Sequence, residues 1–140
     1  MNKKKQITTA IFTAIGAAIG SGLVNAYFSN RPINFEKELM KASAEINKNC
    51  PMVLDKHTQL NTTLGGPGKK LTYIYSLTNI DTSLLDKENF TQEMRPQLLN
   101  NVKTNPDMKF YQDNDIDLVY QYNEPSGNIF VQIKIDGSEY

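Results

Sequence analysis

The chain has 140 residues, with fifteen basic and fifteen acidic side chains. Without the three lysines near the amino terminus, twelve basic side chains stand against fifteen acidic ones, so the rest of the chain has a net charge of −3. Nucleic acid is therefore a poor partner, because phosphate binding needs a clustered basic face. One cysteine and one histidine are too few for a zinc site, and we expect no metal or other cofactor.

An uncharged segment from Ile7 to Phe28 follows these lysines and contains twenty-two residues. At ~1.5 Å per residue, a helix of this length covers ~30 Å, the thickness of the hydrocarbon core of a bilayer. The lysines precede the segment and the next basic residue, Arg31, stands alone, which favours a cytoplasmic amino terminus. We therefore expect a single-pass protein of the inner membrane. Its parts are a basic cytoplasmic tail (1–6), a transmembrane anchor or uncleaved signal (7–28) and a periplasmic domain (29–140).

Cleavage of the segment is the alternative. Val24 and Ala26 are small residues at the −3 and −1 positions of a signal-peptidase site before Tyr27. A cut after Ala26 leaves a secreted or periplasmic domain without an anchor. The length of the uncharged segment favours retention, and so do the rings of Tyr27 and Phe28, which suit the membrane interface.

The same segment contains a GxxxG pattern at Gly16 and Gly20, with Thr13 and Ala17 beside it. Small residues at this spacing allow two helix backbones to approach closely in a bilayer. The pattern predicts packing against a second copy or another membrane helix. A span rich in alanine and glycine also contains such a pattern by chance, so both explanations stay open.

The first half of the domain predicts one helix and one hairpin. Asn34 can cap a helix in which Phe35, Leu39, Ala42 and Ile46 form an apolar stripe that ends before Pro51. From Met52 to Leu64 the apolar period changes to two, which indicates a strand. The glycines between Gly65 and Gly68 predict a turn into a second strand over Leu71–Leu77, and therefore an antiparallel hairpin.

The second half repeats this order. An apolar helical stripe runs between Lys87 and Lys103, where Pro96 predicts a kink or the first residue of a new helix. A helical turn from Asn105 through Phe110 leads to strands over Ile116–Tyr122 and Ile129–Ile135, a second hairpin. The chain is therefore expected to form an α+β domain in αββαββ order, with two helices on one face of a four-stranded antiparallel sheet.

Five short motifs resemble a group of small, mostly uncharacterised bacterial proteins that have a hydrophobic leader and one exported domain. The motifs are Cys50-Pro51-Met52-Val53-Leu54-Asp55, Thr58-x-Leu60, Leu71-x-Tyr73-x-Tyr75, Asn105-Pro106-x-Met108 and Tyr120-x-Tyr122. Members of the group often have a second cysteine just before the Asn-Pro element, able to pair with the first. Here Val102, Lys103 and Thr104 occupy that region, so Cys50 has no partner. The resemblance implies an exported domain and supplies no catalytic residue.

Asp55 and His57 are the candidates for acid/base chemistry. On a regular strand they share a face ~7 Å apart and can form a dyad with one intervening group. Cys50 and His57 point to opposite faces, which disfavours a cysteine–histidine pair. The solvent-exposed side of a strand explains the same pattern without any chemistry.

Aromatic residues on the predicted strands are the best candidates for a partner surface: Tyr73, Tyr75, Tyr120, Tyr122 and Phe130. Packing within the core is the alternative. We expect a non-enzymatic, membrane-anchored interaction module of the bacterial envelope, which assists or inhibits a protein complex there. The alternative is a secreted carrier of small ligands, or a small hydrolase that uses the aromatic face together with Asp55 and His57.

Overall fold

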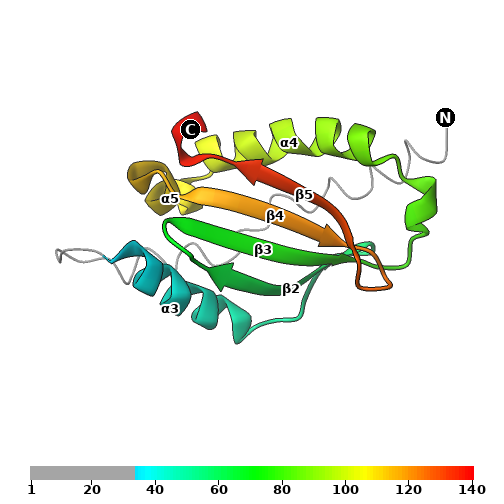
Figure 1. The fold of residues 1–140 in the computed structure, drawn as a ribbon, viewed down its shortest axis with the longest axis horizontal. Helices are drawn as coiled ribbons and strands as arrows, with labels where there is room; N and C mark the ends of the chain where they lie inside the picture. The colour runs from blue at the N-terminus through cyan, green and yellow to red at the C-terminus, as the bar shows by residue number, and fades with distance from the viewer. Residues whose placement is uncertain (1–33) are drawn as a thin grey trace.

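The computed structural model describes residues 34–140, which form three α-helices, five β-strands and three 3-10 helices (Figure 1). The α-helices are α3 (Phe35–Asn47), α4 (Lys87–Thr104) and α5 (Lys109–Asn114), and the 3-10 helices are η1 (Thr82–Leu84), η2 (Pro106–Met108) and η3 (Gly137–Glu139). The strands are β1 (Met52–Asp55), β2 (Thr58–Gly65), β3 (Lys70–Leu77), β4 (Asp117–Asn123) and β5 (Ile129–Ile135). Within residues 34–140, no helix has the length and apolar character needed to cross a membrane. The predicted membrane segment, with Thr13, Gly16, Ala17 and Gly20, lies outside the described residues.

Helix α3 forms where the sequence predicts it. The Asn34 side chain accepts a hydrogen bond from the Lys37 N–H at 3.1 Å, which satisfies one of the free donors at the start of the helix. Its buried apolar side chains are Leu39, Ala42 and Ile46. They face β2, where a Cβ atom on Gly65 would lie only 2.3 Å from the Leu39 backbone. Glycine at this position therefore allows the helix to lie directly on the strand.

The prediction of one strand from Met52 to Leu64 is wrong, because this segment forms the two antiparallel strands β1 and β2. The chain reverses after Asp55, whose Oδ1 atom accepts a hydrogen bond from the His57 N–H at 2.7 Å. An aspartate that bonds to the backbone two residues ahead closes a turn. The sheet therefore has five strands, in the order β1-β2-β3-β4-β5, with β1 at one edge.

The sheet is also mixed and not wholly antiparallel. The two predicted hairpins are confirmed as the antiparallel pairs β2–β3 and β4–β5, but β3 and β4 run parallel. The chain leaves β3 at Leu77, passes through α4 and α5, and re-enters the sheet at Asp117, beside Lys70 at the start of β3. A helical crossover of this kind returns the chain in the original direction.

Between β3 and β4 the structure contains a third helix, α5, in addition to the two predicted ones. Helix α4 is continuous from Lys87 to Thr104 and contains Pro96, so a new helix does not begin at the proline. The predicted turn after Asn105 is confirmed as η2, and the Asn105 side chain caps it by accepting the Asp107 N–H at 2.9 Å. Helix α5 then follows directly and ends at Asn114.

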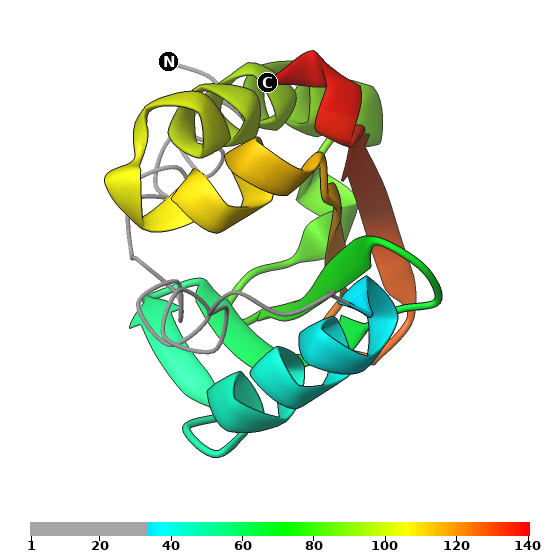
Figure 2. The same ribbon diagram turned by 90° about the vertical axis from the view of Figure 1, so that its left-hand side faces the viewer.

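The three helices pack on one face of the sheet, where the sequence predicted two helices on one face. Figure 2 shows α4 and α5 together at the top and α3 below them. The contacts that fix this inner face are those of Thr63 with Ser43 of α3, Tyr73 with Tyr111 of α5 and Tyr122 with Phe90 of α4. The hydrophobic core lies between this face and the helices.

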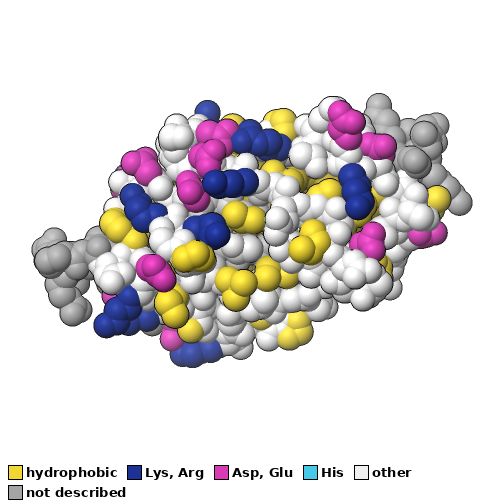
Figure 3. Space-filling model, viewed as in Figure 1, with side chains coloured by type: hydrophobic (Ala, Val, Ile, Leu, Met, Phe, Trp, Pro, Cys, Tyr) yellow, Lys and Arg dark blue, Asp and Glu magenta, His cyan; other side chains and the backbone are white. Residues whose placement is uncertain are grey.

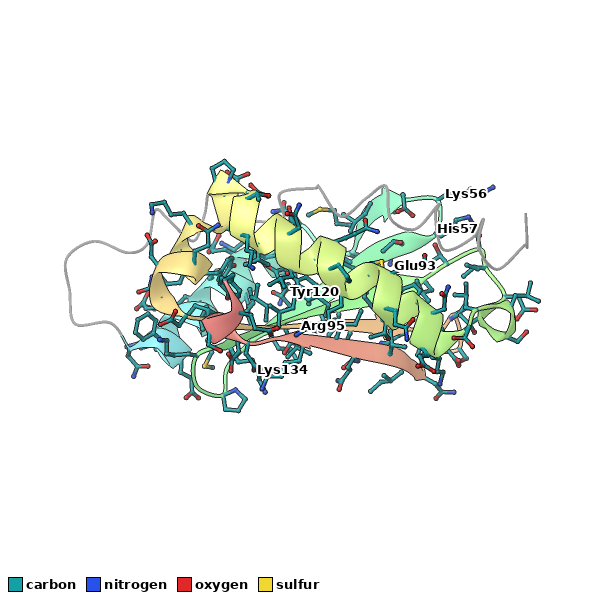
Figure 4. The ribbon with its side chains drawn as sticks, turned by 90° about the horizontal axis from the view of Figure 1, so that it is seen from above. Lys56, His57, Glu93, Arg95, Tyr120 and Lys134 are labelled. Carbon is teal, nitrogen blue, oxygen red and sulfur yellow. The ribbon has the colours of Figure 1, made fainter. Side chains whose placement is uncertain are left out.

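Strand β5, at the other edge, is covered by contacts from α4 and η3. Arg95 of α4 donates hydrogen bonds to both carboxylate oxygens of Glu139, at 2.6 and 2.8 Å, and to the Lys134 carbonyl oxygen at 3.3 Å. Figure 4 shows Arg95 beside β5 and close to Lys134. The Lys134 carbonyl oxygen is thus occupied and not free to pair with a strand of another molecule.

Candidate interaction surface

The five aromatic residues predicted as a partner surface lie in the core, with 2% to 6% of each residue exposed. They are Tyr73, Tyr75, Tyr120, Tyr122 and Phe130. Because β3 and β4 are parallel and in register, Tyr73 stacks on Tyr120 at 5.3 Å and Tyr75 stacks on Tyr122 at 5.0 Å between ring centroids. These aromatic residues thus pack in the core, which was the alternative interpretation. Their contact with a partner protein stays a prediction.

Burial determines the ionisation of these tyrosines. Loss of solvent raises the pKa of Tyr73 to about 12, although its hydrogen bond with Tyr111 acts in the opposite direction. Burial is also the main cause that raises the pKa of Tyr75, Tyr120 and Tyr122. The hydroxyl group of Tyr120 is buried without a hydrogen-bond partner in the described structure. These phenols are therefore neutral packing groups at physiological pH.

Asp55 and His57 hold the turn between β1 and β2. Besides the bond from Asp55 to the His57 N–H, His57 Nδ1 lies 3.2 Å from the Thr78 carbonyl oxygen. The Lys56 carbonyl accepts a hydrogen bond from Asn79 at 3.1 Å, which fastens the turn to the segment after β3. Figure 4 shows Lys56 and His57 at this end of the molecule, away from α5. The regular strand on which the predicted dyad depended is absent here, and both residues have roles in the turn.

The other oxygen of Asp55, Oδ2, is buried without a hydrogen-bond partner in the described structure. Thr58 pairs with Asp55 across the two strands. Its hydroxyl oxygen is also buried without a hydrogen-bond partner in the described residues. The carboxylate also raises the pKa of Tyr122, as a smaller cause than burial. This group of polar atoms lies on the inner face, at the end of the sheet where β1 turns into β2.

The opposite side of the sheet, called the outer face from here on, is turned away from the three helices. Paired residues of neighbouring strands share a face, so the register defines one row of outer residues on each strand. From β1 to β5 the rows are Val53; then Gln59, Thr62 and Leu64; then Lys70, Thr72, Ile74 and Ser76; then Asp117, Val119, Gln121 and Asn123; then Ile129, Gln132 and Lys134. Asn61 lies at a bulge of β2 and belongs to the same face, because its side chain donates a hydrogen bond to the Ser76 hydroxyl. The charged members, Lys70, Asp117 and Lys134, lie toward one end of the rows.

The rest of the outer face mixes aliphatic and amide side chains. Three of its aliphatic residues are largely exposed: Val53 by 73%, Leu64 by 52% and Ile129 by 54%. Figure 3 views this side and shows hydrophobic and uncharged polar side chains across its centre, with charged groups toward the rim. Depletion of charge at the centre of a patch, with a charged rim, is typical of protein–protein interfaces. The outer face is therefore the candidate interaction surface.

Amide groups link neighbouring strands across this face. Gln132 of β5 donates to Gln121 of β4 at 2.7 Å, and Gln121 donates to Asn123 at 3.0 Å. On the other side, Gln59 donates to Asn61 at 3.0 Å, and Asn61 donates to the Ser76 hydroxyl. Each amide offers two N–H donors and an oxygen with two lone pairs, so these bonds use only part of its capacity. The remaining donors and acceptors are therefore available for other hydrogen bonds.

The charged end of the outer face is balanced by local pairs. Lys134 forms an ion pair with Asp136 at 3.1 Å, and Asp117 accepts the Gly137 N–H at 2.8 Å. The hydrogen bond and the charge of Asp136, and then the charge of Asp117, raise the pKa of Lys134. This end therefore carries no strong charge of one sign that would attract a highly charged partner.

The sequence prediction of a partner surface rested on aromatic side chains and did not include the residues of the outer face. The signal was present in the strand alternation, since the positions between Leu71, Tyr73 and Tyr75 are Thr72 and Ile74, both uncharged. What the sequence alone did not provide was the register, which joins these rows into one surface.

The domain is similar to three solved structures. Each matches with a TM-score of 0.57, and the low sequence identities mean that only the fold is shared. They are the candidate secreted protein PA3611 of Pseudomonas aeruginosa (15% identity, covering 78% of this chain and 98% of that one), the type 2 secretion system pilotin EpsS of Vibrio vulnificus (6%, 75% and 90%) and the type II secretion system pilotin AspS of Vibrio cholerae (10%, 76% and 93%).

Residues 34–130 match a protein family described as "Domain of unknown function (DUF8479)". No curated protein sequence matches the chain.

Proposed function

We propose that this chain, which belongs to the DUF8479 family, is a non-enzymatic interaction module of the bacterial cell envelope. In this proposal residues 7–28 anchor it in the inner membrane, and the domain lies in the periplasm, where it assists or inhibits a protein complex. The outer face of the sheet is the surface through which it acts.

The single observation that carries the proposal is the composition of the outer face. A surface spanning five strands, with aliphatic residues exposed and charge confined to one end, leaves Val53, Leu64 and Ile129 in contact with water. Burying apolar area against another protein gains ~25 cal/mol per Å², whereas exposed charges would have to lose their hydration first. A protein surface that covers the face is thus favoured over solvent.

The shared fold supports an envelope location and a non-catalytic role. Two of the similar structures are pilotins of type II secretion systems and a third is a candidate secreted protein. The positions of Asp55 and His57 agree with this, because Asp55 Oδ1 accepts the His57 N–H and His57 Nδ1 lies beside the Thr78 carbonyl oxygen, both of them backbone groups. The resemblance of the Cys50 to Tyr122 motifs to exported bacterial proteins points in the same direction.

Location is tested with reporters fused after Tyr140. An alkaline phosphatase fusion, which is active only outside the cytoplasm, should be active, and a fusion to a fluorescent protein that needs the cytoplasm should be dark. The reverse pattern would contradict the proposal. Amino-terminal sequencing of the mature protein then separates an anchor from a cleaved signal, since cleavage gives a chain that begins at Tyr27.

Interaction is tested on the full chain extracted in mild detergent. The wild type should migrate in a native gel as a complex larger than its 15.8 kDa. Ile74→Lys with Val119→Lys places two charges at the centre of the outer face and should dissociate that complex. Met40→Lys is the matched control, because Met40 is 56% exposed on α3 and lies on no strand of the outer face. A complex that survives the double substitution would show that the outer face is not the interaction surface.

A further inference from the structure

We infer that the molecule that covers the outer face is a second copy of this chain, packed face to face about a two-fold axis. This inference rests on the proposed role of the outer face as an interaction surface and names its occupant. It is independent of the GxxxG pattern, which concerns the membrane segment.

The amide groups make the face complementary to itself. Gln59, Asn61, Gln121 and Gln132 each carry donors and an acceptor, so a two-fold axis can place a donor of one copy opposite an acceptor of the other. A surface of acids or of bases would repel its own copy at the same contact. Here the centre is uncharged and self-association requires no buried charge.

The aliphatic residues provide the apolar contact between the copies. Ile74 and Val119 lie on the two central parallel strands in adjacent register positions, with Ile74 opposite Gln121 and Val119 opposite Thr72. Two sheets that pack face to face approach to ~10 Å with their strands inclined by about 30°, which allows such side chains to interdigitate. Val53 on β1 and Ile129 on β5 lie toward the two sides of the same surface.

The charged end also suits a second copy better than a charged partner. Lys70 and Lys134 lie beside Asp117 and Asp136, so the end is internally neutral. It offers no field that would steer a strongly acidic or basic protein to the face. Two identical ends placed on opposite sides of a two-fold axis do not repel each other strongly.

The size of the face predicts a weak dimer. Five strands at ~4.8 Å spacing and about 20 Å length give a footprint of roughly 480 Å². A standard stable interface buries about 800 Å² on each partner, so association should be dynamic in dilute solution. Confinement of both copies to one membrane raises their effective concentration and favours the dimer without any new contact.

The inference is tested by cross-linking the full chain in its native membrane. Cys50 is replaced by Ser, and a single cysteine is introduced either as Gln121→Cys, at the centre of the face, or as Met40→Cys, on α3. A short bis-maleimide should give a product of twice the 15.8 kDa chain mass from Gln121→Cys, at several-fold higher yield than from Met40→Cys. Adding Ile74→Lys should abolish the product, while Gly16→Ile with Gly20→Ile should leave it.

Three results would overturn the inference. Equal yields from the two cysteine positions would mean that the faces do not meet. A product of another mass from Gln121→Cys would mean that a different protein covers the face, in which case the proposed function stands and only the identity of the occupant is wrong. Loss of the product in the Gly16→Ile, Gly20→Ile variant would assign the contact to the membrane segment.

Discussion

The rings of Tyr73 and Tyr120 stack 5.3 Å apart because β3 and β4 lie parallel and in register, joined by a crossover through α4 and α5. Tyr75 and Tyr122 form a second stacked pair two residues further along the same strands, with ring centroids 5.0 Å apart. The inner face of the sheet is therefore a packed aromatic layer under the helices. The rows of the outer face contain no aromatic residue, and we propose that this face contacts other molecules.

The buried Tyr120 hydroxyl predicts that Tyr120→Phe does not destabilise the domain. The hydroxyl has no hydrogen-bond partner in the described structure. Its removal therefore breaks no hydrogen bond and eliminates the free-energy cost of burying an unpaired polar group. We expect the free energy of unfolding to stay constant or to rise by about 1 kcal/mol. Tyr120→Leu is the comparison, because it also removes the ring that stacks on Tyr73 and should lower stability. Urea denaturation followed by circular dichroism measures both, and a clear loss in Tyr120→Phe would mean that the hydroxyl has a partner.

Stability should fall steeply in alkaline solution. The pKa of Tyr73 is raised to about 12 in the folded protein, from an ordinary value of 10.0. Below pH 10 this tyrosine is neutral in both the folded and the unfolded chain, so its contribution is fully present. Between pH 10 and 12 only the unfolded chain loses the proton, and the contribution is lost. Phenolate absorbance should therefore rise together with the loss of circular dichroism, and a rise centred at pH 10 in folded protein would contradict the buried position.

The close contact between α3 and β2 predicts a large effect of Gly65→Ala. The new Cβ atom would lie 2.3 Å from the Leu39 backbone, so the helix would have to move away from the strand. Overpacking of this kind costs about 1 to 3 kcal/mol, or more where backbone must shift. Gly127→Ala is the control: Gly127 has a φ of +95° but nothing within 4 Å of the added atom, so only its conformational cost appears. Equal losses in the two variants would contradict the contact.

The turn at Asp55 distinguishes structure from chemistry. Asp55→Asn keeps an oxygen that can accept the His57 N–H and removes the charge next to the buried Oδ2 position, so stability should be maintained or increased. Asp55→Ala removes the acceptor and should lower the free energy of unfolding by about 1 kcal/mol. Thermal melts of the two variants provide the comparison. An Asp55→Asn variant as unstable as Asp55→Ala would mean that the charge itself holds the turn.

The local features of the fold were predictable from sequence. The Asn34 cap, the stripe of Leu39 and Ile46, and the two hairpins follow from residue types and periodicity, which act over a few residues. The turn after Asp55 was missed because it contains neither glycine nor proline, and alternation of apolar residues continues across it. The parallel pairing of β3 with β4 was missed because strand direction depends on where the crossover helices pack.

The candidate surface was only partly predictable, for a related reason. The sequence shows uncharged residues at alternate strand positions, such as Thr72, Ile74 and Gln121, but each strand alone says little about function. Only the register brings these rows together into one face, and only the helices decide which face is covered. The aromatic residues were assigned to a surface because Tyr73 and Tyr75 share a strand face, which is true of a core layer as well.

The central claim, that the outer face is an extracytoplasmic contact surface, is tested most directly by labelling cysteines in intact spheroplasts with a membrane-impermeant maleimide. In the Cys50→Ser background, Leu64→Cys and Met40→Cys replace residues that are 52% and 56% exposed in the domain, on the outer face and on α3 respectively. We predict rapid labelling of Met40→Cys and slow labelling of Leu64→Cys, which becomes equally rapid once detergent separates the bound molecules. Equal labelling before detergent would contradict a covered outer face, and no labelling of either cysteine until the membrane is opened would contradict the extracytoplasmic location.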